Sequence, residues 1–134
     1  MKPSPAVPSN VNKVRPADLK VIGAMGDSIT VASLSKDFED DMTKDIYPGN
    51  SYIIGGDGTL AEQITILREF NPNIVGLSHG TGYDNTVFNV AVGGRTSEDM
   101  PRQARDLIAR MKQKGVRSFL LCKASKVQNG EMAQ

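Results

Sequence analysis

The stretch VIGAMGDSIT, residues 21–30, joins an apolar run to a turn. The run has strand character and ends in Gly26-Asp27-Ser28. A serine just past a buried strand, with a glycine that lets the chain turn sharply, is how a hydrolase presents a nucleophile. The same tripeptide is also ordinary turn chemistry, in which Asp27 or Ser28 caps the next helix. The tripeptide alone therefore leaves catalysis and simple turn formation both open.

Strand-like and helix-like segments alternate along the rest of the chain. Strands are predicted over residues 18–25, 51–54, 74–77, 87–92 and 116–122. A helix is predicted after the capping box Thr59-Leu60-Ala61-Glu62, and it ends before Pro72, which cannot continue it. This alternation predicts an α/β fold with a mainly parallel sheet.

Residues 98–113 carry the clearest helical pattern. Their apolar side chains recur at i, i+3, i+4 and i+7, as Ala104, Leu107, Ile108 and Met111. Gly115 follows as a natural C-terminal stop.

The composition fits one domain and narrows the classes of function. The chain has 134 residues, a net charge of +1 and 5% aromatic residues, so neither a nucleic-acid footprint nor a set of base-stacking platforms is expected. Cys122 is the one cysteine, which excludes an intrachain disulfide and a cysteine-rich metal site. As a buried strand residue it would act as a small hydrophobe rather than a nucleophile. The sequence shows neither a signal peptide nor a membrane span.

Two other stretches have a conceivable binding chemistry. The acidic run at residues 36–41 is read as a solvated face, with a cation site as the alternative. The loop Gly55-Gly56-Asp57-Gly58 precedes a predicted helix, where backbone amides could hold a phosphate. It lacks the Lys-Ser/Thr of a P-loop and the Gly-x-Gly-x-x-Gly pattern, so a tight strand-to-helix turn explains it better.

The blocks around Ser28 and residues 89–94 together resemble a known family. Gly26-Asp27-Ser28 after a first strand, followed later by Asn89-Val90-Ala91-Val92-Gly93-Gly94, resembles the GDSL lipases, or SGNH hydrolases. The segments RPADLKVIGAMGDSIT, IGGDGTLAEQITILREFNPN, GTG and NVAVGGRTSEDMPRQARDLIARMK are similar to the opening part of a membrane-associated phospholipase B-type domain. The resemblance covers about residues 14–112.

The resemblance implies a fold, a reaction and a set of site residues. The fold is a three-layer α/β/α flavodoxin-like one, and the reaction is hydrolysis of acyl esters in phospholipids and lysophospholipids, with no cofactor or metal. Ser28 takes the nucleophile position and its N–H an oxyanion position, while the N–H of Gly94 takes a second one. Gly26 and Asp27 support the turn. The substrate is lipid, a membrane surface is a possible partner, and nucleic acid is not.

The family pattern breaks after residue 112. Neither the Gly-x-Asn-Asp block nor the Asp-x-x-His block occurs, and Asn129 lies in a turn context instead. His79 is the one histidine, but it precedes the second block and no aspartate stands three residues before it. We therefore expect a Pro-rich linker or tail over 1–16, a partial esterase domain over 17–122, and a polar tail over 123–134.

The missing blocks leave two functions open. The first is an esterase domain that is catalytically incomplete as this chain stands. The second is a non-catalytic lipid- or protein-binding remnant of such a domain. The compartment also stays open, because the family is secreted or carried on membrane ectodomains and this sequence shows the signals for neither.

Overall fold

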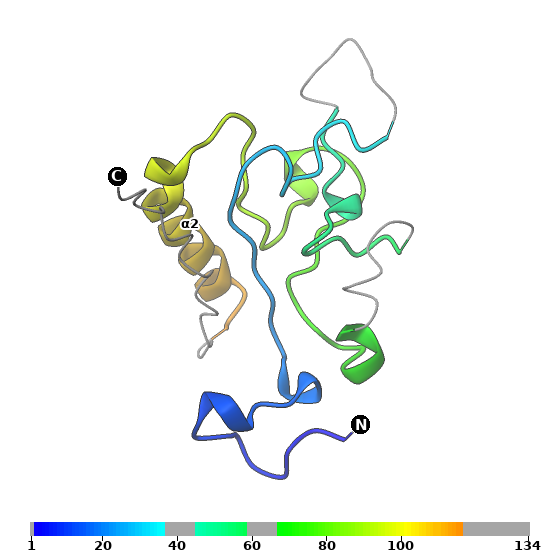
Figure 1. The fold of residues 1–134 in the computed structure, drawn as a ribbon, viewed down its shortest axis with the longest axis vertical. Helices are drawn as coiled ribbons and strands as arrows, with labels where there is room; N and C mark the ends of the chain where they lie inside the picture. Colours follow the sequence, from blue (N-terminus) through cyan, green and yellow to red (C-terminus); the bar gives the residue numbers. More distant parts are fainter. Residues whose placement is uncertain (1, 37–44, 59–66, 117–134) are drawn as a thin grey trace, which may run out of the picture.

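The computed structural model describes residues 2–36, 45–58 and 67–116 (Figure 1). One long helix, α2, and five short 3-10 helices are the named elements of these ranges, and residues 67–70 are also helical. Their bounds are η1 Val11–Lys13, η2 Pro16–Asp18, η3 Pro48–Asn50, η4 Tyr83–Asn85, η5 Ser97–Asp99 and α2 Met100–Gln113. The described residues contain isolated β-bridges but no longer strand.

Four extended segments lie side by side, in the order 54–56, 74–78, 20–26 and 88–92. Three parallel bridges set this order, between Gly55 and Ser78, Val21 and Val75, and Ala24 and Asn89. The carboxyl ends of parallel segments meet at one edge, where loops carry functional groups in many α/β proteins. The mainly parallel arrangement predicted from the sequence is therefore present as single bridges rather than as strands.

Local backbone conformation explains why the bridges do not extend into ladders. Gly76 has φ of +113° and Val87 has φ of +50°, and both conformations interrupt an extended segment. The predicted strand over 51–54 is wrong, because residues 52–54 form a turn in which the amide of Gly55 donates to the carbonyl of Ser51 at 2.9 Å. Of the strand predicted over 18–25, only Val21 and Ala24 form bridges, and Asp18 belongs to η2 instead.

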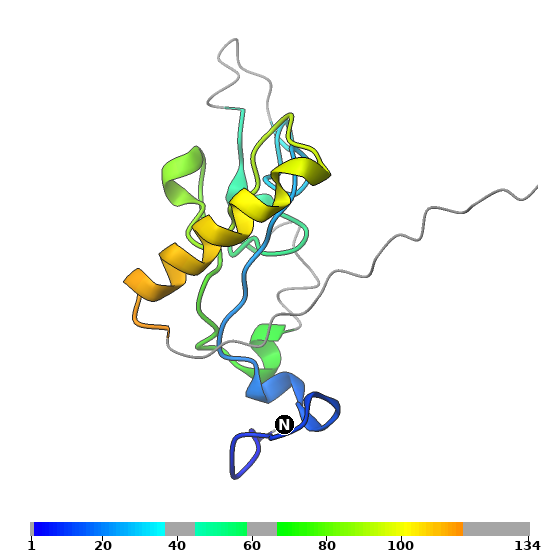
Figure 2. The ribbon, with the colours of Figure 1, turned by 90° about the vertical axis from the view of Figure 1, so that its left-hand side faces the viewer.

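Helix α2, with η5 before it, confirms the helix predicted over 98–113. The Thr96 amide donates to the Asp99 carboxylate at 3.1 Å, which caps the entry into η5 and α2. Figure 1 shows α2 to one side of the extended segments, and Figure 2 shows it crossing in front of them. Gly23 permits this approach, since a Cβ there would lie 2.9 Å from methyl groups of Leu107 and Met111.

The core lies between α2 and the extended segments. Its buried members are Ala24, Ile54, Ile74, Leu77, Phe88, Val90, Leu107 and Met111. A smaller buried cluster of Val31, Ile46 and Ala91 packs at the carboxyl edge. Several predicted features lie outside the described residues: all of the strand predicted over 116–122 except Val116, the start of the helix after Thr59, most of the acidic run, and the tail over 123–134.

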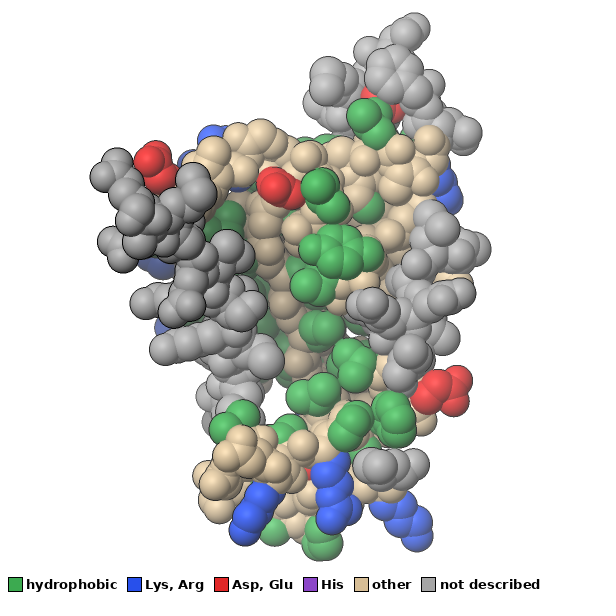
Figure 3. Space-filling view, in the orientation of Figure 1, with side chains coloured by type: hydrophobic (Ala, Val, Ile, Leu, Met, Phe, Trp, Pro, Cys, Tyr) green, Lys and Arg blue, Asp and Glu red, His purple; other side chains and the backbone are tan. Residues whose placement is uncertain are grey.

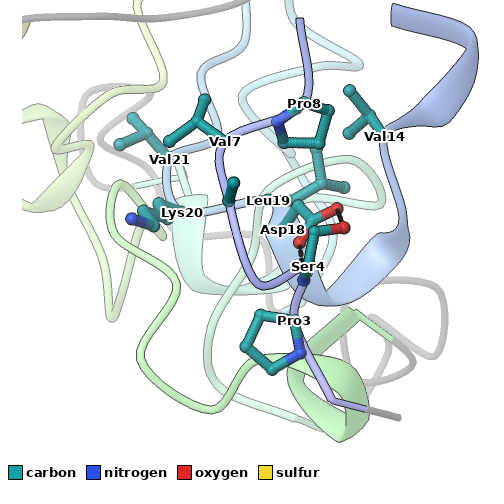
Figure 4. Close-up of a pocket in the computed structure, with 10 residues that line it drawn as sticks. Pro3, Ser4, Val7, Pro8, Val14, Asp18, Leu19, Lys20 and Val21 are labelled. Atoms are coloured by element: carbon teal, nitrogen blue, oxygen red, sulfur yellow. Dashed lines mark hydrogen bonds between the residues drawn. The ribbon is translucent and has the colours of Figure 1, made fainter. Parts of the chain in front are cut away.

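The N-terminal arm, residues 2–16, folds back onto Asp18 (Figure 4). The Ser4 amide and hydroxyl donate to the two Asp18 oxygens at 2.6 and 2.8 Å, and the Arg15 amide donates at 2.9 Å. An apolar pocket of about 480 Å³ lies between the arm and residues 18–21. This pocket lies at the amino end of segment 20–26, whereas Ser28 follows the carboxyl end of the same segment. The division into a linker and a domain stays a prediction.

Candidate active site

Ser28 lies in a turn that Asp27 organises. The Asp27 side chain accepts a hydrogen bond from the Ile29 amide at 3.0 Å, and the backbone carbonyl of Asp27 accepts one from the Val31 amide at 3.1 Å. The Ser28 carbonyl accepts from the Ser33 amide at 2.9 Å. An aspartate that bonds the amide two residues ahead is a turn former. The supporting role expected for Asp27 at an active site stays a prediction.

Gly26, at the start of this turn, lies in a confined space. A Cβ at Gly26 would overlap the side chain of Thr30, so only glycine fits without a shift. On the other side, the buried side chain of Gln103 on α2 pairs with both the amide and the carbonyl of Gly26, at 2.8 Å each.

Two buried side chains hold the far end of the turn. The Thr30 carbonyl accepts from the Asn89 side-chain amide at 3.0 Å and from the Ser51 hydroxyl at 2.7 Å. Asn89 also accepts from the Ala91 amide at 3.2 Å. Asn89 therefore connects the Ser28 turn directly to the segment that leads into Gly93.

The structure brings Gly93 against Ser28, although 65 positions separate them in the chain. A Cβ built on Gly93 would lie 3.9 Å from the Ser28 Cβ and 3.9 Å from the Tyr83 hydroxyl. The Gly93 amide donates to that hydroxyl at 3.3 Å. Gly94 follows with φ of +74°, a left-handed conformation that favours glycine.

The backbone amides of Ser28 and Gly94 are available to a ligand. No hydrogen bond within residues 2–36, 45–58 and 67–116 uses either amide as a donor. An unpaired amide beside a serine hydroxyl can donate a hydrogen bond to the carbonyl oxygen that becomes negative during attack. An oxyanion role is expected from the sequence for these same two amides, and that role stays a prediction.

His79 is paired with Asp57, and among the described residues no hydrogen bond joins it to Ser28. Its Nδ1 lies 3.1 Å from Asp57 Oδ1, and the second Asp57 oxygen accepts from the Gly80 amide at 2.7 Å. In the described part of the chain, the Ser28 hydroxyl has no hydrogen-bond partner, so no base is joined to it. The Asp57 carboxylate also sits in the loop that was considered for phosphate, and its charge disfavours an anion there. Cys122 and Asn129 lie outside the described residues.

Apolar side chains are exposed beside the Ser28 turn. Ile29, the next residue, is 71% exposed, and Leu34 is 51% exposed. Figure 3 shows hydrophobic side chains along the middle of one face of the molecule. Such a rim suits an apolar ligand better than a charged one.

Sequence reasoning missed the distant residues that hold the two turns. Gln103, Asn89 and Ser51 bond the Ser28 turn, and Tyr83 bonds the Gly93 amide. For Gln103 a signal was present, because it lies four and eight positions before Leu107 and Met111 and so shares their buried helix face. Asn89 belongs to the block of residues 89–94 that carries the family resemblance. Its hydrogen bond to Thr30, however, joins residues far apart in the chain and could not be predicted from that block. Nothing local marks Ser51 or Tyr83.

Comparison with known proteins confirms the resemblance. The family described as GDSL-like Lipase/Acylhydrolase matches residues 22–128. Phospholipase B1, membrane-associated, from Rattus norvegicus is 43% identical over 113 residues, which is 82% of this chain and 8% of that protein. The Homo sapiens protein of the same name is 42% identical over 114 residues, or 83% of this chain and 8% of that protein. No solved structure matches.

The chain thus spans about 8% of the length of these curated relatives. Their name describes them as membrane-associated. Within the described residues of this chain, no helix has the length and apolar character needed to cross a bilayer.

Proposed function

The chain belongs to the GDSL-like lipase/acylhydrolase family, and we propose that it carries the nucleophile and two oxyanion donors of a phospholipase B-type acyl hydrolase. The observation that carries this proposal is the close approach of Gly93 to Ser28, together with the amides of Ser28 and Gly94, which have no hydrogen-bond partner among the described residues. We further propose that the complete domain has the three-layer α/β/α fold.

In the proposed reaction, the Ser28 hydroxyl oxygen attacks the carbonyl carbon of an acyl ester. The electron pair of the carbonyl moves to its oxygen, which accepts hydrogen bonds from the amides of Ser28 and Gly94. Collapse of this intermediate breaks the ester bond, releases the alcohol with a proton and leaves an acyl-serine, which water then hydrolyses. Ser28 must give up its own proton to a base in the first step.

None of the described residues places a base against the Ser28 hydroxyl. His79 is engaged with Asp57, and the 134 residues contain no Asp-x-x-His. Loss of a base costs several orders of magnitude in rate, while the oxyanion donors and binding alone retain a fraction of the catalysis. We therefore propose that residues 1–134 by themselves hydrolyse esters slowly, and that an added base speeds the reaction.

Phospholipid and lysophospholipid esters are the proposed substrates. The name of the matched relatives, phospholipase B1, supports this class. The exposed side chains of Ile29 and Leu34 beside the nucleophile turn also support it, since an acyl chain or the surface of a lipid aggregate can cover them. No cofactor is proposed.

The test is labelling of purified residues 1–134 by a fluorophosphonate probe, with and without added imidazole as a small-molecule base. We expect weak labelling that rises with imidazole and disappears in Ser28→Ala. Ser97→Ala, which removes an exposed serine of η5, is the matched control and keeps the labelling.

Two results contradict parts of this proposal. A folded chain that takes no label at any imidazole concentration rejects the esterase site and favours the non-catalytic lipid- or protein-binding remnant. Fast labelling of Ser28 without imidazole rejects the missing base, because an activated nucleophile then already exists.

A further inference from the structure

We propose that Gln103 is a positioning residue, which fixes the Ser28 turn relative to the Gly93-Gly94 turn. This inference rests on the proposed function, because those two turns carry the nucleophile and the oxyanion donors. Gln103 touches no reacting atom in this arrangement. Its effect passes through the backbone of Gly26.

The contact has two hydrogen bonds of opposite direction. The Gln103 Oε1 accepts from the Gly26 amide at 2.8 Å, and its Nε2 donates to the Gly26 carbonyl at 2.8 Å. Gln103 is only 4% exposed, so both bonds form away from water. Leaving a buried polar group without a hydrogen-bond partner costs free energy. The arrangement in which Gln103 and Gly26 are paired is therefore favoured.

The same glycine is also bonded to the second turn. The Val92 amide donates to the Gly26 carbonyl at 3.3 Å. Val92 directly precedes Gly93-Gly94, and Gly26 is two residues before Ser28. Gly26 is therefore the point where α2, the nucleophile turn and the oxyanion turn meet, and Gln103 is the side chain from α2 that holds it.

A side-chain amide is the group that this site requires. It offers one acceptor and two donors, and the contact uses one of each. A leucine at position 103 offers neither. A glutamate offers both only when it is protonated, since its carbonyl then accepts from the Gly26 amide and its hydroxyl donates to the Gly26 carbonyl. An ionised glutamate has no donor, and it places a negative charge against the Gly26 carbonyl.

This difference makes Gln103→Glu a reversible test. In residues 1–134 labelled with ¹⁵N, we expect the Gly26 amide resonance of Gln103→Glu to shift as the new carboxyl group titrates and to approach its wild-type position at low pH. The wild type lacks a carboxyl group at position 103, so subtracting its pH profile removes any contribution from the neighbouring Asp27 carboxyl. Gln113→Glu, at the exposed end of the same helix, is the matched control and leaves Gly26 unchanged.

Gln103→Leu measures the full loss. We expect the hydrogen-exchange protection of the Gly26 amide to fall at least about tenfold, and the amide resonances of Ser28 and Gly94 to move. Labelling of Ser28 by fluorophosphonate with imidazole should slow by about 100-fold, as expected for a misplaced reacting group. If Gln103→Leu does not fold, the pH dependence of Gln103→Glu gives the same answer.

The outcomes separate this inference from the proposed function. Unchanged Ser28 and Gly94 resonances in both variants overturn the inference, and so does a lost Gly26 contact with undiminished labelling. If the wild type takes no label, the proposed function fails. The resonances then still decide whether Gln103 sets the relation between the two turns.

Discussion

The imidazole of His79 lies against the carboxylate of Asp57, with Nδ1 3.1 Å from Oδ1. The other carboxylate oxygen accepts from the Gly80 amide at 2.7 Å. Gly56, next to Asp57, is packed so closely that a Cβ there would overlap the His79 ring. The pair joins the loops that follow segments 54–56 and 74–78, at the same edge of the fold as Ser28 but without contact to its hydroxyl.

His79→Ala therefore tests whether this histidine has a structural or a catalytic role. Both side chains of the pair are partly exposed, so we expect the free energy of unfolding to fall by at most about 1 kcal/mol. Labelling of Ser28 by fluorophosphonate should stay at the wild-type rate. Loss of that labelling in a folded variant contradicts the structural role and makes His79 the base.

Asp57→Ala should cost more stability than His79→Ala. It removes the acceptor of the Gly80 amide as well as the partner of the imidazole, and a lost hydrogen bond to a carboxylate at a partly exposed site costs about 1–2 kcal/mol. Urea denaturation of both variants measures the difference. Equal losses mean that the Gly80 bond contributes nothing.

Gly94→Ala and Gly115→Ala form a matched pair for the oxyanion position. The two glycines have φ of +74° and +73°, and an added Cβ meets no atom within 4 Å at either. Each substitution should therefore cost about 1–2 kcal/mol of backbone strain. Only Gly94→Ala should slow the labelling of Ser28, because relief of the strain turns the Gly94 amide away. Equal labelling in both variants argues against Gly94 as a donor.

Gly23 and Leu107 should be coupled in a double-mutant cycle. Gly23→Ala places a Cβ 2.9 Å from a Leu107 methyl group, and such overpacking costs about 1–3 kcal/mol. Leu107→Ala empties part of the core and costs about 2–5 kcal/mol. The double variant should lose less than the sum of both, since the shortened side chain leaves room for the new methyl group. Additive losses in urea denaturation contradict this packing.

The attachment of the N-terminal arm to Asp18 should depend on pH. Hydrogen bonds from the Ser4 amide, and then from the Arg15 amide, lower the pKa of Asp18. The folded pKa lies below the unfolded one, so the stabilisation is complete above the ordinary aspartate pKa of about 3.9 and is lost as the pH falls through the folded value. The Ser4 amide resonance should shift over that acidic range. Asp18→Asn should abolish the transition, and a transition that persists assigns it to another group.

The sequence predicted the elements whose causes are local. α2 follows from the spacing of Leu107 and Met111, and its end follows from Gly115. The hydrogen bond from the Ile29 amide to the Asp27 side chain is likewise local, because an aspartate that bonds the amide two residues ahead needs no distant partner. The family was identified from blocks of residues in the right order, and the matched range of 22–128 confirms it.

The expected strands show where local patterns fail. Residues 51–54 have the apolar character of a strand but form a turn that buries Ile54. Gly76 and Val87 adopt backbone conformations that shorten the pairing of their segments, and no residue pattern announces a positive φ at a valine. The parallel order was expected from the alternation of strands and helices, and the bridges retain it.

By itself the sequence determined the family, helix α2 and the turn chemistry of Gly26-Asp27-Ser28, because side-chain spacing and turn preference act within a few residues. Only the tertiary structure decided that Gln103 pairs with Gly26, that Gly93 lies against Ser28 and that His79 faces Asp57. Those meetings depend on how α2 and the extended segments pack around a shared core, and that packing is a property of the whole chain rather than of any stretch within it.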